Sequence, residues 1–271
     1  MRIDLHIHSN ASDGALAPSE VVTRAADAGL DLIALADHDT TAGVAPARAA
    51  AADRDIQVLS AIEISASHRD RDIHILGYQV DPDAPILAEH STEARARRDI
   101  RIRKMIERLE ELGVGVEYEA VVEEAGPNAQ ALARPHLARV LWNQGHVSSV
   151  AQAFDRYIAD DGPAYVAVHA LDVAGAIERV HQAGGIAVWA HPPMPLLGGA
   201  LDEFVGAGLD GIECYRPRVA PPELSRLLNK ARQHGLLVTG GSDWHGDWHG
   251  DLGSFYLDPD VLDDFLDRVG I

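Results

Sequence analysis

The stretch IDLHIH at residues 3–8 decides the fold. Apolar and polar residues alternate in it, as in a β-strand. A helix-like segment that begins at Pro18 and ends at Gly29 connects it to the next apolar run, 32–36. Short apolar runs and alanine-rich helical segments succeed each other in this way at both ends of the chain. They predict strands near residues 3–8, 32–36, 57–64, 73–80, 186–189, 211–214 and 236–239. Such an alternation predicts an α/β fold around a parallel sheet or barrel.

Between residues 81 and 165 the alternation stops and only helical patterns follow one another. We therefore expect three segments: a first part of the barrel in 1–80, a helical insertion in 81–165 that covers the substrate, and a second part of the barrel in 166–271. The first helix of the insertion, 86–112, also has a basic face. That face either attracts phosphates or, as the simpler interpretation, pairs with nearby glutamates in solvent; its residues are Arg97, Arg101, Lys104 and Arg108.

Composition narrows the possible functions. The 271 residues carry 42 acidic and 23 basic side chains, a formal net charge of −19, which repels duplex nucleic acid. The single cysteine, Cys214, excludes an intramolecular disulfide, and the sequence has no apolar run long enough to span a membrane. Because the N-terminus enters a strand pattern without a signal-peptide stretch, we expect a cytoplasmic protein. The oligomeric state is left open.

Histidines and carboxylates gather where the predicted strands end. His6 and His8 are two residues apart in a strand, so their imidazoles face the same side. The carboxyl ends of parallel barrel strands converge on one mouth, and burying so many polar groups there without a cation would be costly. The sequence therefore predicts a metal site, and its candidate ligands are His6, His8, Asp13, His38, Glu63, His74, His191, Asp243 and His245.

Nine ligands are more than one ion needs, so we expect two or three divalent ions, with Mn²⁺, Zn²⁺ and Fe²⁺ all compatible with ligands of this kind. Asp37 and Asp39 flank His38 and either orient ligand imidazoles or serve as solvated or helix-capping residues. The other histidines have no ligand spacing and are expected to be mostly exposed; they are His68, His90, His146, His169, His181, His234 and His249.

Four short motifs resemble those of the PHP (polymerase and histidinol phosphatase) family: DLHIHS at 4–9, DHD at 37–39, His74 alone, and SDWH at 242–245. The resemblance implies a distorted (β/α)₇ barrel, the PHP fold, whose metal centre hydrolyses phosphate esters through a metal-bridging hydroxide. It also implies three ligand sets. These are His6, His8, Glu63 and Asp243 for one ion; Glu63, His74 and His191 for a second; and Asp13, His38 and His245 for a third.

SDG at 12–14 and RPHLAR at 134–139 are similar to the branch that includes nucleoside 3′,5′-bisphosphate phosphatases. This implies that Arg134 and His136 contact substrate phosphates. Our catalytic candidates are His136, Glu63 and His191, and either a metal-bound water or His136 would protonate the leaving group. Arg216 and Arg218 are further candidates for substrate binding, or else solvated loop charges. We expect a metal-dependent phosphatase acting on a small phosphorylated metabolite. The resemblance implies the 3′-phosphate of nucleoside 3′,5′-bisphosphates as its target and short 5′-phosphorylated oligonucleotides as further substrates. Histidinol-phosphate phosphatase is the alternative enzyme, and a non-catalytic metal-binding scaffold is the alternative of another class.

Overall fold

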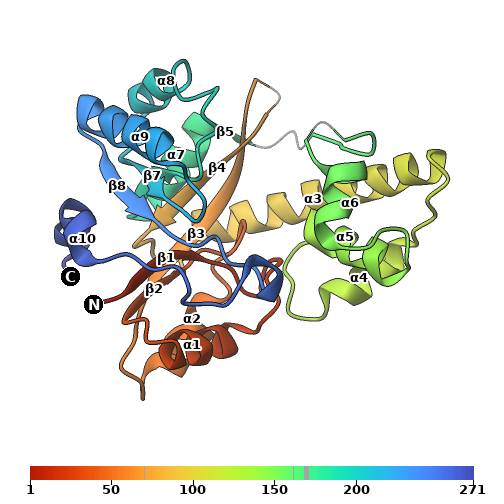
Figure 1. Ribbon diagram of the computed structural model, residues 1–271, viewed down its shortest axis with the longest axis horizontal. Helices are drawn as coiled ribbons and strands as arrows, with labels where there is room; N and C mark the ends of the chain where they lie inside the picture. Colours follow the sequence, from red (N-terminus) through yellow and green to blue (C-terminus); the bar gives the residue numbers. More distant parts are fainter. Residues whose placement is uncertain (70, 161, 168–170) are drawn as a thin grey trace.

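The computed structural model describes residues 1–69, 71–160, 162–167 and 171–271 (Figure 1). Its eight strands form one mixed sheet with the order β1-β2-β3-β4-β6-β7-β8, and the short β5 pairs with β3 beside this path. The strands are β1 (Ile3–Ile7), β2 (Leu32–Leu35), β3 (Gln57–His68), β4 (Arg71–Tyr78), β5 (Leu171–Asp172), β6 (Ile186–Trp189), β7 (Gly211–Tyr215) and β8 (Leu237–Gly240).

Helices connect most of these strands and surround the sheet. Local sequence explains their ends. Pro18 is the first residue of α1 and Pro221 that of α9, and α9 is followed by Gly235, whose φ of 65° favours glycine. The helices are α1 (Pro18–Asp27), α2 (Val44–Ala51), α3 (Pro85–Glu111), α4 (Tyr118–Ala125), α5 (Arg134–Asn143), α6 (Val150–Ala153), α7 (Val173–Gln182), α8 (Leu201–Gly206), α9 (Pro221–His234) and α10 (Asp263–Val269). Shorter turns of helix are η1 (Phe154–Ile158), η2 (Asp247–His249) and η3 (Pro259–Val261).

The direction of β4 corrects the expected all-parallel sheet. β4 runs antiparallel to both β3 and β6, whereas β1, β2 and β3 are mutually parallel, as are β6, β7 and β8. The physical reason is the short connection between β3 and β4, because a parallel pair needs a crossover of a dozen or more residues. The fold is therefore mixed α/β with a curled sheet, not a regular repeat of parallel βα units.

The chain after β8 comes back to β1. The N–H of His8 donates to the carbonyl of Trp244 over 2.9 Å, and Ile7 and Trp244 form an isolated parallel bridge. Gly241 permits this approach, because a side chain at that position would collide with the backbone of His6. The polar segment 242–245 is thereby placed against the end of β1.

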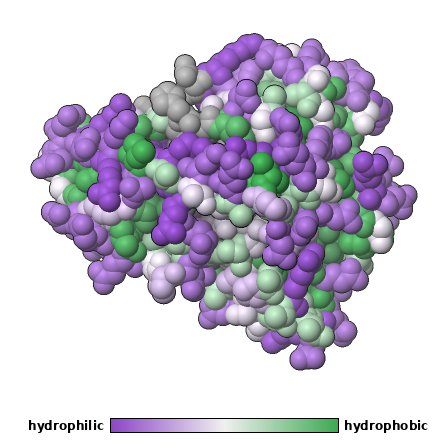
Figure 2. Space-filling model, turned by 180° about the vertical axis from the view of Figure 1, so that it is seen from behind, coloured by the Kyte–Doolittle hydropathy of each residue, from purple (hydrophilic) through white to green (hydrophobic). Residues whose placement is uncertain are grey.

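Helices α3 to α6 and the turn η1 lie between β4 and β5 in the chain. Figure 1 shows α3 leaving the sheet, with α4, α5 and α6 gathered around its far part. They share their own buried apolar cluster, which includes Ile102, Met105, Leu109, Leu137 and Leu141. Among the described residues, no helix is both long and apolar enough to cross a membrane. Hydrophilic residues dominate the face seen in Figure 2, with apolar side chains in small groups between them.

Candidate metal centre and substrate pocket

Strand β1 supplies two histidines at its carboxyl end. His6 and His8 flank Ile7 and face the same side of the strand, with ring centroids 5.1 Å apart. Both side chains are fully buried, although an imidazole has two polar nitrogens that need partners. Two buried imidazoles that could bind a metal ion thus lie side by side at the end of β1.

The β3–β4 hairpin adds a carboxylate and a third imidazole. Ser65 is the register partner of His74, and Glu63 lies two residues before Ser65 on the same face. This pairing puts His74 Nδ1 3.0 Å from Glu63 Oε1. His191, just after β6, brings its Nε2 to 2.9 Å from the same oxygen. Without the antiparallel β4, His74 would not face Glu63.

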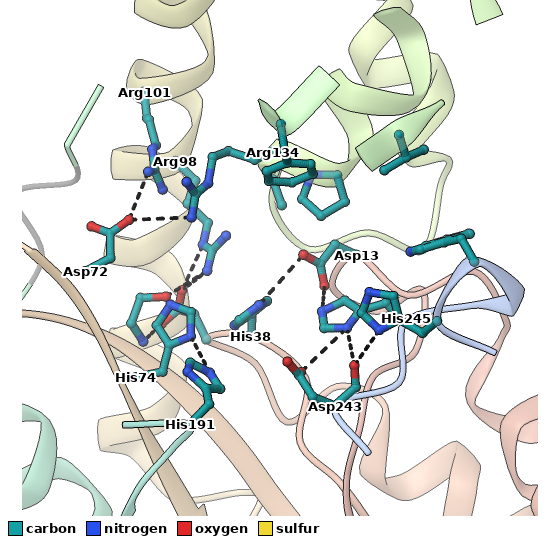
Figure 3. Close-up of a pocket in the computed structure, with 18 of the residues that line it drawn as sticks. Asp13, His38, Asp72, His74, Arg98, Arg101, Arg134, His191, Asp243 and His245 are labelled. Carbon is teal, nitrogen blue, oxygen red and sulfur yellow. Dashed lines mark hydrogen bonds and ion pairs between the residues drawn. The ribbon is translucent and has the colours of Figure 1, made fainter. Parts of the chain in front are cut away.

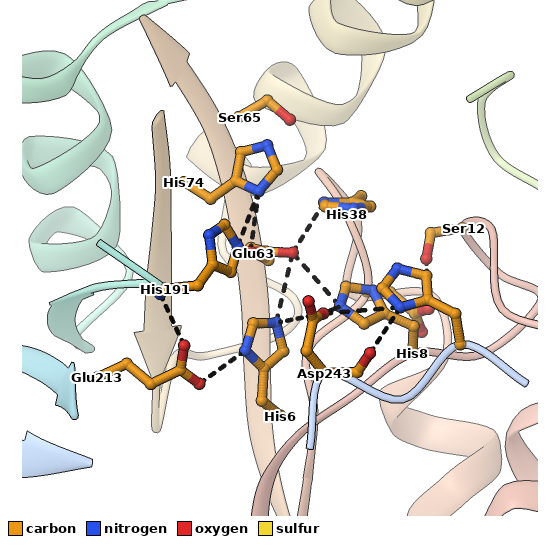
Figure 4. Close-up of polar contacts among 12 residues, drawn as sticks. His6, His8, Ser12, His38, Glu63, Ser65, His74, His191, Glu213 and Asp243 are labelled. Atoms are coloured by element: carbon orange, nitrogen blue, oxygen red, sulfur yellow. Dashed lines mark hydrogen bonds and ion pairs between the residues drawn. The ribbon is translucent and has the colours of Figure 1, made fainter. Parts of the chain in front are cut away.

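Glu63 lies at the centre of the cluster (Figure 4). While Oε1 faces two imidazoles, Oε2 faces three more, at 2.9 Å from His38 Nδ1, 3.3 Å from His8 Nε2 and 3.5 Å from His6 Nε2. A carboxylate that meets nitrogen donors on both of its oxygens has the arrangement of a bridging ligand. Glu63 is therefore placed to contact more than one ion.

Three groups of side chains could each hold an ion. Within each group the ligand atoms lie within 4.8 Å of one another. The groups are His6, His8, Glu63 and Asp243; His8, Asp13, His38 and His245; and His38, Glu63 and His74. The first coincides with a ligand set that the family resemblance implies, and the second adds His8 to the expected trio. His191 lies beside the third group, with its Nε2 3.2 Å from His74 Nδ1.

The unpaired atoms at this point fit metal ions. Five buried atoms of the first group form no hydrogen bond of suitable geometry among the described residues: His6 Nε2, His8 Nδ1, His8 Nε2, Glu63 Oε2 and Asp243 Oδ1. A buried polar atom without a hydrogen bond costs about 1–3 kcal/mol, so five together need an explanation. Nitrogen and carboxylate oxygen are the ligands that divalent zinc, manganese and iron accept. The residues present therefore fit a centre with several metal ions.

Charges inside the cluster are strongly coupled. Burial would raise the pKa of Glu63, but the imidazoles of His38, His74 and His6 hold it well below the usual range. Burial would likewise lower the pKa of His245, but the carboxylates of Asp13 and Asp243 raise it to about 9. The carboxylates are thus ionised and available as ligands, whereas some imidazoles must lose a proton before they bind an ion.

Three residues of the site have left-handed backbones. The φ angles of Asp39, His191 and Asp243 are 56°, 29° and 53°. Residues other than glycine adopt such angles at a cost, and they persist where the surrounding structure fixes them, often at functional sites. These angles turn the chain sharply at the strand ends and direct the side chains of His191 and Asp243 to the cluster.

Sequence reasoning missed Glu213 of β7. Its Oε1 lies 2.9 Å from His6 Nδ1, and its Oε2 accepts the backbone N–H of His191 at 2.7 Å (Figure 4). Glu213 is fully buried and contributes to a raised pKa of His6. By accepting from Nδ1 it leaves Nε2 of His6 free to bind an ion. The signal was present, because a single acidic residue stands inside an apolar strand.

The two acids around His38 have different partners. Asp37 orders the loop after β1, where it accepts from the backbone N–H and hydroxyl of Ser9 and the hydroxyl of Ser12. Asp39 instead binds helix α3: it accepts from Arg98 Nε at 2.8 Å, and its Oδ1 lies 2.8 Å from His90 Nε2. Neither contacts a ligand imidazole directly. One of the two alternatives for Asp37 and Asp39 was that they orient ligand imidazoles. Glu213 has this role instead, through its contact with His6 Nδ1.

The expectation that the remaining histidines are mostly exposed is wrong, because, of the six described ones, only His181 and His249 are exposed and His90 is buried. Its side chain is fully buried, and it lies between Asp39 and Arg179. His90 is buried because the first half of α3, which carries it, packs against the sheet. His169 lies outside the described residues.

A pocket of about 710 Å³ opens over the metal-ligand cluster (Figure 3). One wall carries candidate ligands, among them Asp13, His38, His74, His191, Asp243 and His245. Arginines of α3 and α5 line the opposite side, namely Arg97, Arg98, Arg101 and Arg134. Arg101 is only 9% exposed, so the solvated-face interpretation of the basic residues is wrong for this one. Lys104 and Arg108 are exposed, and Arg97 lies 3.3 Å from Glu93, as the simpler interpretation expects.

The substrate-binding candidates occupy different positions. Arg134 lines the pocket and donates to Asp160 at 2.6 Å, and Arg218 lines it as well. His136 is buried at the start of α5, where its Nδ1 accepts the N–H of Ala133 at 3.0 Å. Arg216 does not line this pocket and points to Glu223 of α9, with 3.9 Å between the charged atoms.

Comparison with known proteins agrees with this geometry. A family model described as "PHP domain" matches residues 4–97. A 3′,5′-nucleoside bisphosphate phosphatase of Chromobacterium violaceum is 37% identical over 258 residues, which are 93% of this chain and 90% of that protein. A 5′-3′ exoribonuclease of Haemophilus influenzae is 35% identical over 254 residues, 90% of each chain.

Solved structures show the same arrangement of the chain. The structure of an amidohydrolase from Chromobacterium violaceum, with bound sulfate and no metal, superposes with a TM-score of 0.88 at 35% identity, covering 95% of this chain and 92% of that one. Similarity of this extent, together with the buried cluster of histidines and carboxylates, identifies the family. The chain belongs to the PHP-domain family of metal-dependent phosphoesterases.

Proposed function

We propose that this phosphoesterase removes the 3′-phosphate from nucleoside 3′,5′-bisphosphates. The observation that carries the proposal is the pocket with a metal-ligand cluster on one wall and arginines on the other. A substrate with two phosphates matches such a pocket, because one phosphate can lie at the ions while arginine holds the second. The name of the relative from Chromobacterium violaceum supports the same substrate class.

The second phosphate is best placed beside Arg134 and Arg101. The carboxylate of Asp72 already lies between these arginines, at 2.9 Å from Arg101 Nη2 and 3.8 Å from Arg134 Nη2 (Figure 3). Both guanidinium groups are thus directed at one anion position. A planar guanidinium donates two parallel hydrogen bonds to a phosphate, so this pair would favour a phosphate over a neutral group.

His136 is suited to donate a hydrogen bond and not to release a proton. Because Nδ1 accepts from the backbone of Ala133, the neutral ring carries its hydrogen on Nε2. Burial lowers the pKa of His136 to about 4, so the ring is uncharged at neutral pH. His136 does not line the pocket, so we propose that its neutral ring holds the start of α5 and thereby positions Arg134.

Residues of the chain hold and orient the reacting groups. Divalent ions bound at the three ligand groups would activate water and neutralise charge on the phosphoryl oxygens. Glu63 belongs to the first and third groups and would link these two, and His191 Nε2, at 2.9 Å from Glu63 Oε1, would complete the ligands of the third. Helices α3 to α6 carry the arginines, so we propose that residues 81–165 form a substrate cap over the barrel parts 1–80 and 166–271.

The test is a comparison of substrates with metal-supplemented protein. Phosphate release is measured after chelation and addition of Mn²⁺, Zn²⁺ or Fe²⁺, with adenosine 3′,5′-bisphosphate, histidinol phosphate and a simple aryl phosphate. We expect the bisphosphate to have the highest kcat/KM and adenosine 5′-monophosphate to be the product. A preference for histidinol phosphate would refute the proposal, and no release with any ion would favour a scaffold.

Short 5′-phosphorylated oligonucleotides are a second candidate substrate. The relative from Haemophilus influenzae is named a 5′-3′ exoribonuclease, which favours this candidate. An oligonucleotide also presents a terminal 5′-phosphate and an adjacent phosphodiester, the same spacing as in a 3′,5′-bisphosphate. Stepwise release of 5′-mononucleotides from a 5′-phosphorylated RNA, and none from its 5′-hydroxyl form, is the expected outcome.

A further inference from the structure

Two of the four tryptophans have partly exposed side chains that line the substrate pocket. Trp189 and Trp244 are buried in the core, at 0% and 2% exposure. Trp142 and Trp248 are 48% and 40% exposed, and both line the pocket above the metal-ligand cluster. An indole ring gains much by burial, so one that stays half-exposed inside a pocket offers a flat apolar surface to a ligand.

Trp248 is held firmly beside the metal centre. It lies in the turn η2, three residues after the candidate ligand His245. Trp244 Nε1 donates to the carbonyl of Gly250, just after this turn, at 2.8 Å, and His249 Nδ1, within the turn, donates to the carbonyl of Asp243 at 2.8 Å. Both hydrogen bonds fasten the turn to the segment that carries two of the ligands. Little conformational entropy is then lost when a ligand packs against Trp248.

One side of Trp248 already has a partner. The guanidinium of Arg139 lies 5.4 Å from the ring centroid, within the range of a cation–π interaction. Arg139 is itself fixed by Glu124, whose Oε1 accepts from Nε at 2.7 Å, and by the carbonyl of Asp13 at 3.3 Å. The arginine supports the indole, which remains 40% exposed.

We propose that Trp248 stacks on the nucleobase of the substrate. The inference rests on the proposed function, in which the 3′-phosphate lies at the metal-ligand cluster. Because the base is joined to the same ribose as that phosphate, it must lie close to the cluster. Trp248 meets this condition, because its ring centroid lies 6.2 Å from that of His249, which in turn lies 5.2 Å from that of His245. Trp142 lies about 12 Å along α5 from Arg134, by the helical rise of eight residues.

The experiment measures how much the base contributes. For each protein, kcat/KM is determined for adenosine 3′,5′-bisphosphate and for a base-free analogue, 1,4-anhydroribitol 3,5-bisphosphate. Stacking of a base on an aromatic side chain predicts that Trp248→Ala lowers the ratio of the two values by between about 5-fold and about 150-fold. Trp248→Phe keeps an aromatic face and should retain most of the ratio. Tyr256→Ala, an exposed aromatic residue that does not line the pocket, is the matched control and should leave the ratio unchanged.

A binding measurement complements the kinetics. Adenosine 5′-monophosphate should quench the tryptophan fluorescence of the native protein, and Trp248→Phe should remove most of that quenching. An unchanged ratio in folded Trp248→Ala, or a ratio that falls only in Trp142→Ala, would overturn the inference and leave the proposed function intact. If the native protein hydrolyses neither bisphosphate, the proposed function fails and the inference with it. Equal efficiency with both substrates would overturn the inference alone.

Discussion

Substitution of Glu213 by glutamine tests whether this carboxylate orients His6 and His191 for metal binding. In the native protein one carboxylate oxygen accepts from His6 Nδ1 at 2.9 Å and the other from the N–H of His191 at 2.7 Å. Glutamine has nearly the same shape but only one acceptor oxygen. Its amide NH₂ must therefore face one of the two donors, and the negative charge next to His6 is lost.

The magnitude follows from these two contacts. A hydrogen bond to a charged group contributes about 1.5–3 kcal/mol, and Glu213→Gln removes one such bond outright. Substitution of residues that orient metal ligands commonly weakens metal binding about 10- to 100-fold, which corresponds to about 1.4–2.7 kcal/mol. The two free-energy ranges agree. We therefore expect the ion bound by His6 to bind about 10- to 100-fold more weakly in Glu213→Gln.

The assay is a titration of chelated protein with Mn²⁺ or Zn²⁺, with ion content measured independently by elemental analysis. Glu223→Gln is the matched control, since this partly exposed carboxylate of α9 lies 3.9 Å from Arg216 and away from the cluster. It should bind ions as the native protein does. The reasoning is refuted if Glu213→Gln folds normally and binds every ion with native affinity, because His6 would then not depend on Glu213.

Four further predictions concern the pocket, the cap and the ions. Arg134→Ala should lower kcat/KM for adenosine 3′,5′-bisphosphate by about 10- to 100-fold and much less for an aryl phosphate, and equal losses would contradict its phosphate contact. Leu109→Ala, in the buried cluster of α3 to α6, should lower the free energy of unfolding in urea by about 2–5 kcal/mol without loss of bound metal; a parallel loss of metal would contradict a separate cap. At pH 7.5, below the pKa of about 9 of His245, metal binding should release protons, and progressively fewer as the pH rises past 9; calorimetry in two buffers of different ionisation enthalpy measures this. Chelation should also weaken the binding of inorganic phosphate, which the same calorimeter detects.

The metal-ligand cluster could largely be predicted from sequence because it depends on two simple rules. Side chains two apart in a strand share a face, and strand ends meet at one edge of a sheet. These rules place His6 and His8 together and bring them near His38. They needed only the approximate ends of strands, which apolar runs indicate well. The structure brings all nine candidate ligands to one region, while their roles as ligands remain for the metal titrations to test.

The direction of β4 was missed although the sequence contained its signal. The expected strands 57–64 and 73–80 are separated by too few residues for a parallel crossover, so an antiparallel hairpin was the one connection available. Glu213 was missed for a related reason. It was read as part of an apolar strand, and the identity of its partner, His6, depends on how β7 and β1 face each other across the curled sheet.

The burial of Arg98, Arg101 and His90 lay beyond such rules. Periodicity shows that these residues share a helix, but not which face of α3 meets the sheet. That choice depends on Asp39, which binds both Arg98 and His90, and therefore on tertiary contacts between segments about 50 to 60 residues apart. In a long polar helix with a weak apolar stripe, contacts with the rest of the protein determine which face is buried.

The pocket also resolves an apparent contradiction between the charge of the chain and its substrate. A net charge of −19 repels phosphates at long range, yet within a Debye length of about 8 Å the nearest groups determine the interaction. The carboxylates of the cluster are Asp13, Glu63 and Asp243, and two divalent ions would more than neutralise them. Arg98 and Arg101 are largely balanced by Asp39 and Asp72, so these two arginines add little net positive charge to the pocket. Bound ions would therefore supply most of the positive charge at the reacting phosphate, in addition to that of imidazoles such as His245, whose pKa the neighbouring carboxylates raise to about 9.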